Sequence, residues 1–222
     1  MPARRTQNRK ATRRTPPDLP ASIETLNPVL VDVLLAAHRL EEVYAKDIDV
    51  AGISPASVDY RNSILERVSF ANCTAPSVRL RDVRMVRCDL SNAVLRGFEA
   101  TRVEFIDCRL TGMKAIECHW RDVLVENCDA RYAQFTDGRV QNCEFRASRF
   151  TEADFRSTNL EGTVFAGAML HRAELSGAKL RQTDLRGADI GGMTVRAEDV
   201  RGAIVSPAQA MELAGLLGVI IK

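Results

Sequence analysis

The amino-acid sequence predicts an all-β fold, a parallel β-helix that occupies residues 58–205. Three observations lead to this prediction. Every fifth residue from Tyr60 to Val205 is apolar or aromatic, at 30 successive positions. The residue two places before each of them belongs to a second series, in which only Glu198 is charged. The other charged residues of this span all fall on the three remaining places of the five-residue repeat, and no residue is inserted or lost.

A period of five excludes both regular secondary structures as the carrier of this pattern. A helix repeats every 3.6 residues and a strand every two, so neither keeps both series on one buried face. The chain must therefore turn at regular intervals, with two inward residues around one outward residue and a corner made by the last two places. Four such sides would close a square coil, and successive coils would stack by backbone hydrogen bonds. The period by itself leaves the number of sides open.

Residues 1–20 precede the repeat and are rich in Arg, Thr and Pro, which predicts a disordered basic arm. The arm either contacts the phosphates of a nucleic acid or is a solvated tail without a binding role. Its basic residues are Arg4, Arg5, Arg9, Lys10, Arg13 and Arg14.

The two Arg pairs would also suit a twin-arginine export signal, but no clean apolar stretch follows them, so we expect a cytoplasmic protein with reduced thiols. No apolar stretch is long enough to predict a membrane span.

Residues 21–57 are expected to cap the N-terminal end of the β-helix, and part of this segment is expected to be helical. Asn27-Pro28 is a typical helix start, and the apolar residues that follow predict a helix to about Ala45. A cap is needed because the ends of a β-helix expose unpaired backbone groups.

One side of the predicted β-helix has an unusually apolar outer surface. Two alternatives are open: the N-terminal helix covers this surface, or the surface is exposed and binds a partner protein. The candidate partner residues are Ile64, Val86, Ile106, Leu124 and Val164.

All six cysteines fall in the second inward series. Packing at a small inward site therefore explains them better than disulfide or metal spacing does. Cys88, Cys108 and Cys128 recur at every fourth repeat and would stack on one side of a four-sided coil.

Large and small residues compensate each other within the predicted core. Phe98 is large where the series is usually small, and the central residue after it, Ala100, is small. Trp120, the only Trp, would lie above Ala100 and is interpreted as core, as is Phe155.

The C-terminal segment, residues 206–222, is predicted to contain a helix and a short strand. Ser206-Pro207-Ala208-Gln209 is a capping-box sequence, and it predicts a helix from Pro207 to about Leu217 that ends at Gly218. The apolar residues that follow either fold back on the last coil or pair across a two-fold axis in a homodimer, which we favour. The candidate dimer residues are Leu213, Leu217, Val219, Ile220 and Ile221.

No group of residues indicates an enzyme. The three histidines have no nucleophile or base beside them in the pattern, and the sequence contains no glycine loop for phosphates and no metal-ligand spacing. We therefore expect a non-enzymatic protein without cofactor, metal or small-molecule substrate.

Several repeats match a known signature. Ala153-Asp154-Phe155-Arg156-Ser157 and Thr183-Asp184-Leu185-Arg186-Gly187 resemble the A(D/N)LxG-type motif of pentapeptide-repeat proteins, and the repeat covers about two thirds of the chain. The resemblance implies a right-handed, four-sided (quadrilateral) parallel β-helix. The chain is similar in size to the Qnr and MfpA type, which acts on DNA gyrase by imitating the shape and negative charge of duplex DNA and dimerises through a C-terminal helix. The resemblance therefore implies DNA gyrase as the partner and a homodimer.

The sequence departs from that branch in its charge. Between Val58 and Val205 it has 22 basic and 21 acidic residues, so no side has the uniform negative field that phosphate mimicry needs. A local cluster of Glu104, Asp107, Glu126 and Glu144 remains available. Three functions stay open: a topoisomerase modulator, a scaffold for another protein, and nucleic-acid association through the basic arm.

Overall fold

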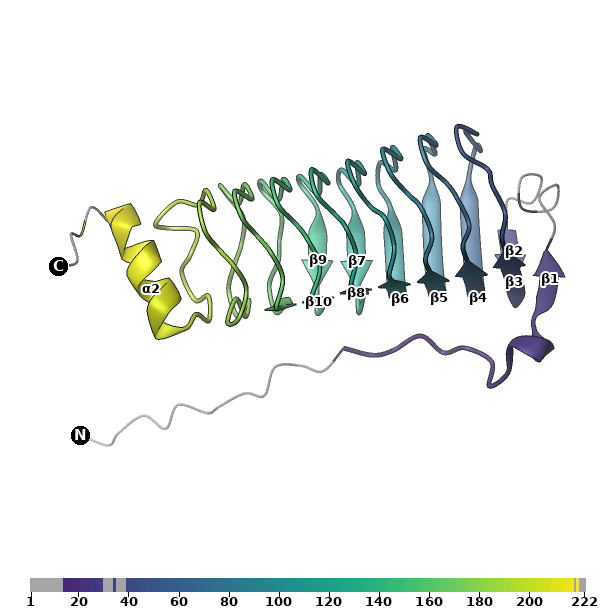
Figure 1. Ribbon diagram of the computed structural model, residues 1–222, viewed down its shortest axis with the longest axis horizontal. Helices are drawn as coiled ribbons and strands as arrows, with labels where there is room; N and C mark the ends of the chain where they lie inside the picture. Colours follow the sequence, from purple (N-terminus) through teal and green to yellow (C-terminus); the bar gives the residue numbers. More distant parts are fainter. Residues whose placement is uncertain (1–13, 30–33, 35–38, 218, 220–222) are drawn as a thin grey trace.

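The structure is a parallel β-helix in which four successive five-residue repeats make one coil (Figure 1). It is a computed structural model that describes residues 14–29, 34, 39–217 and 219. Val58 pairs with Val78, and Ala100 pairs with Trp120, so residues four repeats apart lie in adjacent coils in parallel register. This register confirms the four-sided coil.

The strands are short because each side of the coil is only one repeat long. The longest ones, β4 to β6, turn a corner and contribute to two sides. The strands are β1 (Asn27–Val29), β2 (Arg39–Glu41), β3 (Val43–Lys46), β4 (Val58–Glu66), β5 (Val78–Val86), β6 (Glu99–Ile106), β7 (His119–Arg121), β8 (Leu124–Glu126), β9 (Arg139–Gln141), β10 (Glu144–Arg146) and β11 (Val164–Ala166). Isolated parallel bridges continue the same register to Asp184 and Ile204.

The last place of most repeats forms the corner in a left-handed backbone conformation. Asn72 has a φ of 58° and Gly162 a φ of 75°. Glycine reaches this region freely, and Asn and Asp tolerate it better than other side chains do, which explains their frequency at this place.

The two inward series form the dry interior. Trp120 is 1% exposed and Phe155 is fully buried, as is Phe98. Trp120 stacks on Phe105 with ring centroids 5.5 Å apart. The aromatic rings continue along the axis through Phe135 and Phe155, whose ring centroids lie 5.0 Å apart.

Small polar side chains of the second series satisfy backbone carbonyls inside the β-helix. The Thr158 hydroxyl donates to the Phe135 carbonyl oxygen at 2.6 Å, and the Cys108 thiol lies 3.4 Å from the Met85 carbonyl oxygen. Both carbonyls belong to the preceding coil. Cys, Ser and Thr share this place because each is small and each has a donor that the buried carbonyl needs.

The predicted N-terminal helix is wrong at both of its ends, which are strands, whereas Leu34 between them is helical. Asn27–Val29 is β1 and pairs with β3, and Arg39–Glu41 is β2. A short 3-10 helix, η1 (Ile23–Thr25), precedes them. The five-residue period continues backwards through Val50, Ala45 and Leu40, all buried, so stacking on the coil overrides local helix signals. Residues 30–33 and 35–38 lie outside the described residues.

The C-terminal helix is α2 (Pro207–Ala214), followed by the 3-10 helix η2 (Gly215–Leu217). Ser206 and Gln209 form the predicted capping box, with Pro207 at the start of the helix. The helix lies across the last coil (Figure 1). Val219 is not in a strand, and Gly218, Ile220 and Ile221 lie outside the described residues, so the predicted strand is described only at Val219.

Candidate interaction surface

We number the four sides of the coil by their central inward residues. The first side contains Tyr60, Ala100, Trp120 and Val140; the second Leu65, Phe105 and Phe145; the third Phe70, Leu110 and Phe150; the fourth Ala75, Phe135 and Phe155. The residues directly before and after each centre point outward, and they form the four outer surfaces of the rod.

The candidate partner residues all lie on the second side, but they do not form one continuous stripe. In one column Ile64 and Leu124 are separated by Arg84 and Glu104. Two coils further on, Val164 follows Glu144. Polar side chains therefore interrupt the apolar surface.

Val86 and Ile106 occupy the parallel column of the second side, where they pair directly with each other. Both are partly exposed. Val86 and Ile106 are therefore the apolar outward residues of this side that lie next to each other in adjacent coils.

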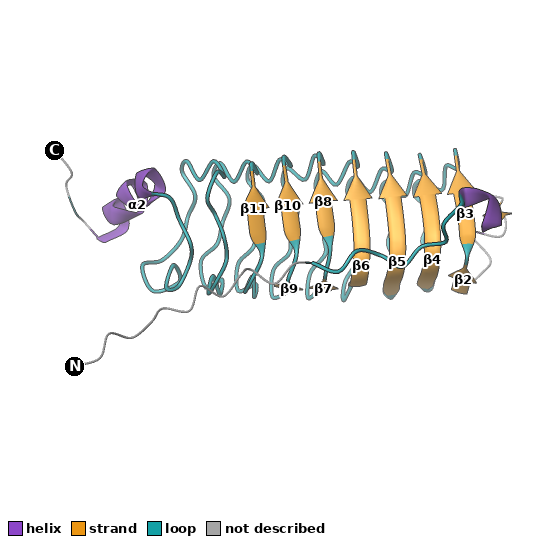
Figure 2. Cartoon of the chain, turned by 90° about the horizontal axis from the view of Figure 1, so that it is seen from below, coloured by secondary structure: helices purple, strands orange, loops and turns teal. Residues whose placement is uncertain are grey.

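Part of the second side is covered, although not by a helix. Leu124 is 4% exposed and Ile64 is 8% exposed, although both occupy outward places. Figure 2 shows the segment that leads to η1 running across β6, β5 and β4. This extended segment, residues 14–20, crosses the side that the first of the two sequence-based alternatives placed beneath an N-terminal helix.

Carboxylates at the corner between the first and second sides hold residues 14–20. The Thr15 amide donates to Asp122 at 3.1 Å, and the Asp18 amide donates to Asp82 at 2.9 Å. The Asn62 side chain donates to the Asp18 carbonyl oxygen at 3.0 Å. The predicted disorder of residues 1–20 is therefore wrong for residues 14–20, because side chains far away in the sequence supply acceptors for their backbone. Nothing in residues 14–20 themselves signals this contact.

Arg14 is anchored by an ion pair instead of being free for a nucleic acid. Its guanidinium lies 2.9 Å from Glu104, and the side chains of both residues are less than a tenth exposed. Glu104 also receives the Arg84 guanidinium at 2.8 Å. Of the predicted arm residues, Arg4, Arg5, Arg9, Lys10 and Arg13 lie outside the described residues.

Asp82 is the best-buried carboxylate of this corner, at 3% exposed. Burial alone would raise the pKa of Asp82. Two hydrogen bonds of 2.6 Å from the Arg102 guanidinium and the bond from the Asp18 amide outweigh burial, so the pKa of Asp82 lies below its ordinary value. Asp82 is therefore ionised in the folded protein at neutral pH.

Ion pairs, some within one coil and some between adjacent coils, neutralise most outward carboxylates. Glu126 pairs with Arg146 at 3.6 Å, and Arg146 also binds Glu144. Of the acidic cluster proposed from the sequence, Glu104, Glu126 and Glu144 are thus paired with arginines. Asp107 has no salt bridge among the described residues. The second side consequently lacks a field of a single negative sign.

An apolar hollow lies between the last coil and α2. Val200, Val205 and Leu213 line it together with Leu216, which is 41% exposed. Val219 beyond it is 52% exposed. Of the other candidate dimer residues, Leu217 belongs to η2, and Ile220 and Ile221 lie outside the described residues.

The interior offers no open reactive site within the described residues. Cys88, Cys108 and Cys128 are buried, free thiols. The Cys108 amide donates to the Cys128 sulfur at 3.3 Å, as stacking on one side predicts. Burial raises the pKa of Cys118 to about 12. In the described part of the chain no three His, Cys, Asp or Glu side chains are grouped as metal ligands.

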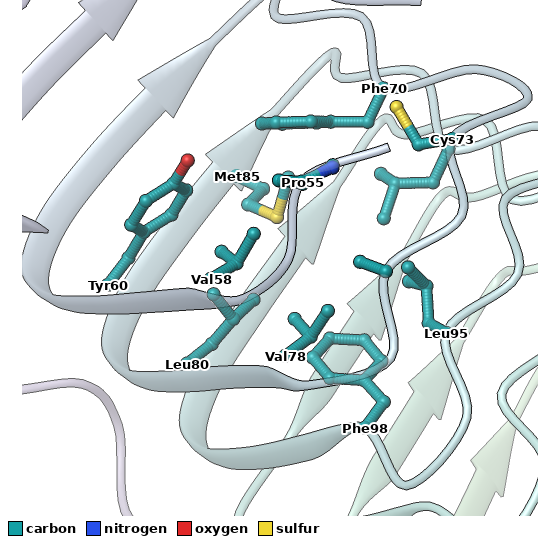
Figure 3. Close-up of a pocket in the computed structure, with 12 residues that line it drawn as sticks. Pro55, Val58, Tyr60, Phe70, Cys73, Val78, Leu80, Met85, Leu95 and Phe98 are labelled. Carbon is teal, nitrogen blue, oxygen red and sulfur yellow. The ribbon is translucent and has the colours of Figure 1, made fainter. Parts of the chain in front are cut away.

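A small apolar cavity lies in the N-terminal coils, between the aromatic rings of Tyr60, Phe70 and Phe98 and smaller aliphatic side chains (Figure 3). It measures about 50 Å³ and is lined by Val58, Val78, Leu80 and Phe98, among others. That volume suits one or two methyl groups rather than a substrate. None of the helices in the described residues is long and apolar enough to cross a membrane.

Comparisons with known proteins agree with this architecture. The family of pentapeptide repeats, in eight copies, matches residues 148–187. A pentapeptide repeat region matches residues 78–155. A search of the curated proteins finds no match.

Among solved structures, a trypsin-treated form of QnrB1, a plasmid-mediated fluoroquinolone resistance protein, is 21% identical. The match covers 88% of this chain and 95% of QnrB1, with a TM-score of 0.53. Full-length QnrB1 is 20% identical over 87% of this chain and 95% of its own, with a TM-score of 0.45. HetL, involved in heterocyst differentiation in the cyanobacterium Nostoc, is 19% identical over 75% of this chain and 86% of its own, with a TM-score of 0.31.

The first of these matches shows a shared fold over nearly the whole of QnrB1. The repeats matched over residues 78–187 and the four-sided coils show that this chain belongs to the pentapeptide-repeat family.

Proposed function

We propose that this protein is a non-enzymatic, rod-shaped binding protein whose target is DNA gyrase or a related type II topoisomerase. The observation that carries the proposal is the uninterrupted four-sided rod, which matches the fold of a fluoroquinolone resistance protein over 95% of that protein. Fluoroquinolones act on this class of enzyme, so the resemblance supports such a target. At 21% identity the match supports the fold directly and the target only by analogy.

The charge of the rod suggests how such contact would differ from phosphate mimicry. Arg84 and Arg146 pair with Glu104, Glu126 and Glu144, three of the carboxylates of the second side. We therefore propose that the topoisomerase recognises the shape of the rod and the adjacent residues Val86 and Ile106, which are flanked by ion-paired side chains. A partner would bury Val86 and Ile106, and its charged groups would form ion pairs with the charged residues that surround them.

A supercoiling assay tests the target. Purified protein is added to DNA gyrase with relaxed plasmid and ATP, with and without ciprofloxacin. We expect altered supercoiling or protection from drug-induced cleavage at micromolar concentration. Indifference of the enzyme under both conditions would remove gyrase as the target.

A pair of isoleucines makes the assay specific for one side. Ile106 on the second side and Ile116 on the fourth side occupy equivalent outward places, and both are partly exposed. Ile106→Arg should reduce the effect on gyrase at least tenfold, and Ile116→Arg should leave it within threefold. Equal effects of the two variants would contradict the assignment to the second side.

We also propose that two copies associate through the C-terminal hollow. The partly exposed Leu216 and Val219, together with Val200 and Val205 of the last coil, form an apolar surface that a second copy could bury by two-fold symmetry. Light scattering of the full chain should give twice the mass of 24.6 kDa. Val219→Arg should give the monomer, whereas Ile53→Arg, an exposed apolar residue at the opposite end, should not change the mass.

A further inference from the structure

The first side carries an excess of positive charge that the second side lacks. Its outward residues, one before and one after each central residue from Tyr60 to Val200, include eight basic and four acidic residues. The same places on the second side hold three basic and five acidic residues. The first and second sides are neighbours on the same rod, so the excess of positive charge belongs to the first side and not to the whole molecule.

The acidic residues of the first side are already occupied. Asp59 pairs with Arg61 at 3.0 Å, Glu99 with Arg79 at 3.3 Å and Glu161 with Arg181 at 3.8 Å. Asp199 accepts from the Gly177 amide at 2.7 Å. Asp199 keeps its negative charge, but the eight basic residues outnumber the four acidic ones, so the net charge of this side is positive.

Five cations of the first side are exposed and make no salt bridge within the described residues. Between Val58 and Val205 only four other Arg or Lys residues share that state, and they are scattered over the remaining three sides: Arg87, Lys114, Arg149 and Arg196. The five on the first side are Arg81, Arg121, Arg139, Lys179 and Arg201.

The register arranges these cations in two parallel columns along the rod. Arg121 pairs with Gln141 and His119 with Arg139 in adjacent coils. These four residues line a shallow groove on the first side, together with Thr101, Trp120 and Glu99, whose carboxylate pairs with Arg79. Coils are about 4.8 Å apart, so the six coils from Arg81 to Arg201 span about 29 Å. That length approaches one turn of duplex DNA, about 34–36 Å.

We propose that the first side binds the phosphate backbone of duplex nucleic acid without base-sequence preference. Four of the five free cations are guanidinium groups, whose planar donors match phosphate oxygens. The neutral Thr101, Gln141 and Asn159 stand between them and can donate further hydrogen bonds to the backbone. The flat, regular columns offer charge but no protruding element that could enter a groove and read bases.

The charge of this surface has the opposite sign to that of a DNA mimic. A mimic presents negative charge to an enzyme, whereas the first side presents positive charge to the nucleic acid itself. This inference does not rest on the proposed topoisomerase function, because it requires no enzyme.

Fluorescence anisotropy with a labelled duplex of mixed sequence, about three helical turns long, tests the proposal with the full chain over a series of KCl concentrations. Binding should weaken steeply with salt, because each neutralised phosphate contributes about −0.9 to the slope of log affinity against log salt concentration. Arg121→Glu with Arg139→Glu should weaken binding at least 30-fold at physiological ionic strength and reduce the slope by about 2. Circular dichroism checks that each variant is folded.

The matched control reverses the same number of charges elsewhere. Lys114→Glu with Arg149→Glu changes the net charge equally, on the fourth and third sides, and should weaken binding less than threefold. Equal losses in the two double variants would show that overall charge, not the first side, attracts the duplex. The absence of binding at the lowest salt concentration would overturn the proposal outright.

Two further measurements separate the alternatives. If Arg9→Glu with Lys10→Glu abolished binding while the first-side variant retained it, the N-terminal arm would be the binding element and the proposal would be wrong. Poly-L-glutamate should compete weakly against the duplex. Competition at the same concentration of charge would indicate an acidic protein as the partner instead of a nucleic acid.

Discussion

The side-chain amide of Gln209 in α2 donates a hydrogen bond to the carbonyl oxygen of Leu185 in the last complete part of the coil, with an N···O distance of 2.6 Å. In earlier coils the equivalent carbonyl receives a hydroxyl from the second inward series, as Leu160 does from Thr183 at 2.9 Å. Gln209 is 5% exposed and also donates to the Ala188 carbonyl oxygen at 2.9 Å. The helix thus replaces a donor that the next coil would have supplied.

Removing this donor should weaken the end of the rod. Gln209→Leu leaves two buried carbonyls without their side-chain donor and breaks the capping box. We expect the free energy of unfolding to fall by about 1–3 kcal/mol in urea denaturation. Gln134→Leu, at an outward place where the side chain makes no hydrogen bond among the described residues, should change it by less than about 0.5 kcal/mol. Equal effects would contradict the role of Gln209 as the end donor.

The cavity in the N-terminal coils should accept one extra methylene group. Val78 lines the cavity, so Val78→Ile is expected to raise the free energy of unfolding by about 0.8 kcal/mol. The same substitution at the fully buried Val103 has no cavity to fill and should lower it by about 1 kcal/mol. Chemical denaturation of both variants checks this, and a destabilising Val78→Ile would mean that the cavity is already closed in solution.

Breaking the ion pair of Arg14 with Glu104 should release residues 14–20. In Arg14→Ala the amides of Thr15 and Asp18, which donate to Asp122 and Asp82, should exchange with solvent at least tenfold faster, because the segment loses its buried anchor. Hydrogen exchange measures this directly. Arg87→Ala, which removes an exposed arginine that makes no salt bridge among the described residues, should leave both rates unchanged.

The six thiols should be unreactive in the folded protein. Burial raises the pKa of Cys118 to about 12, and burial also raises the pKa of Cys73. At pH 8 a thiol with a pKa of 12 is ionised to about one part in ten thousand, and its access is blocked as well. Ellman's reagent should therefore detect no fast thiol in the native protein and six after denaturation. Of the six, Cys73 should react first, because it lines the N-terminal cavity and is the most exposed, at 4%.

Acid should destabilise the protein partly through Asp82. Its pKa in the folded protein is lowered, so the unfolded chain binds more protons around pH 4, and the stabilisation present above that pH is lost as the pH falls through the folded value. In Asp82→Asn the difference in unfolding free energy between pH 6 and pH 3 should shrink. The control is Asp137→Asn, since Asp137 shares the left-handed corner position but is exposed and makes no salt bridge within the described residues. A change as large in this control would assign the acid sensitivity to other carboxylates.

The packing of the interior follows from the five-residue period alone. Because a period of five requires both apolar series to point inward, the sequence predicts that Trp120, Phe155 and Cys108 are buried, as the structure confirms. The C-terminal helix was also predictable from the sequence, because Ser206 and Gln209 form a capping box within four residues of the chain. The N-terminal strands were not predictable in this way. The helix signals around Asn27 are local, whereas the pairing of β1 with β3 depends on residues that the coil brings close together.

The properties of the outer surface depend on contacts between residues that are far apart in the chain. Residues 14–20 come from a distant part of the sequence and cross the second side, where Arg14 binds Glu104 and the Thr15 amide binds Asp122. Which arginines remain free depends on register, because Arg146 meets Glu126 only when adjacent coils place them side by side. A buried column repeats along the chain and is therefore visible in the sequence; contacts between outward side chains follow from the stacking of coils and are not.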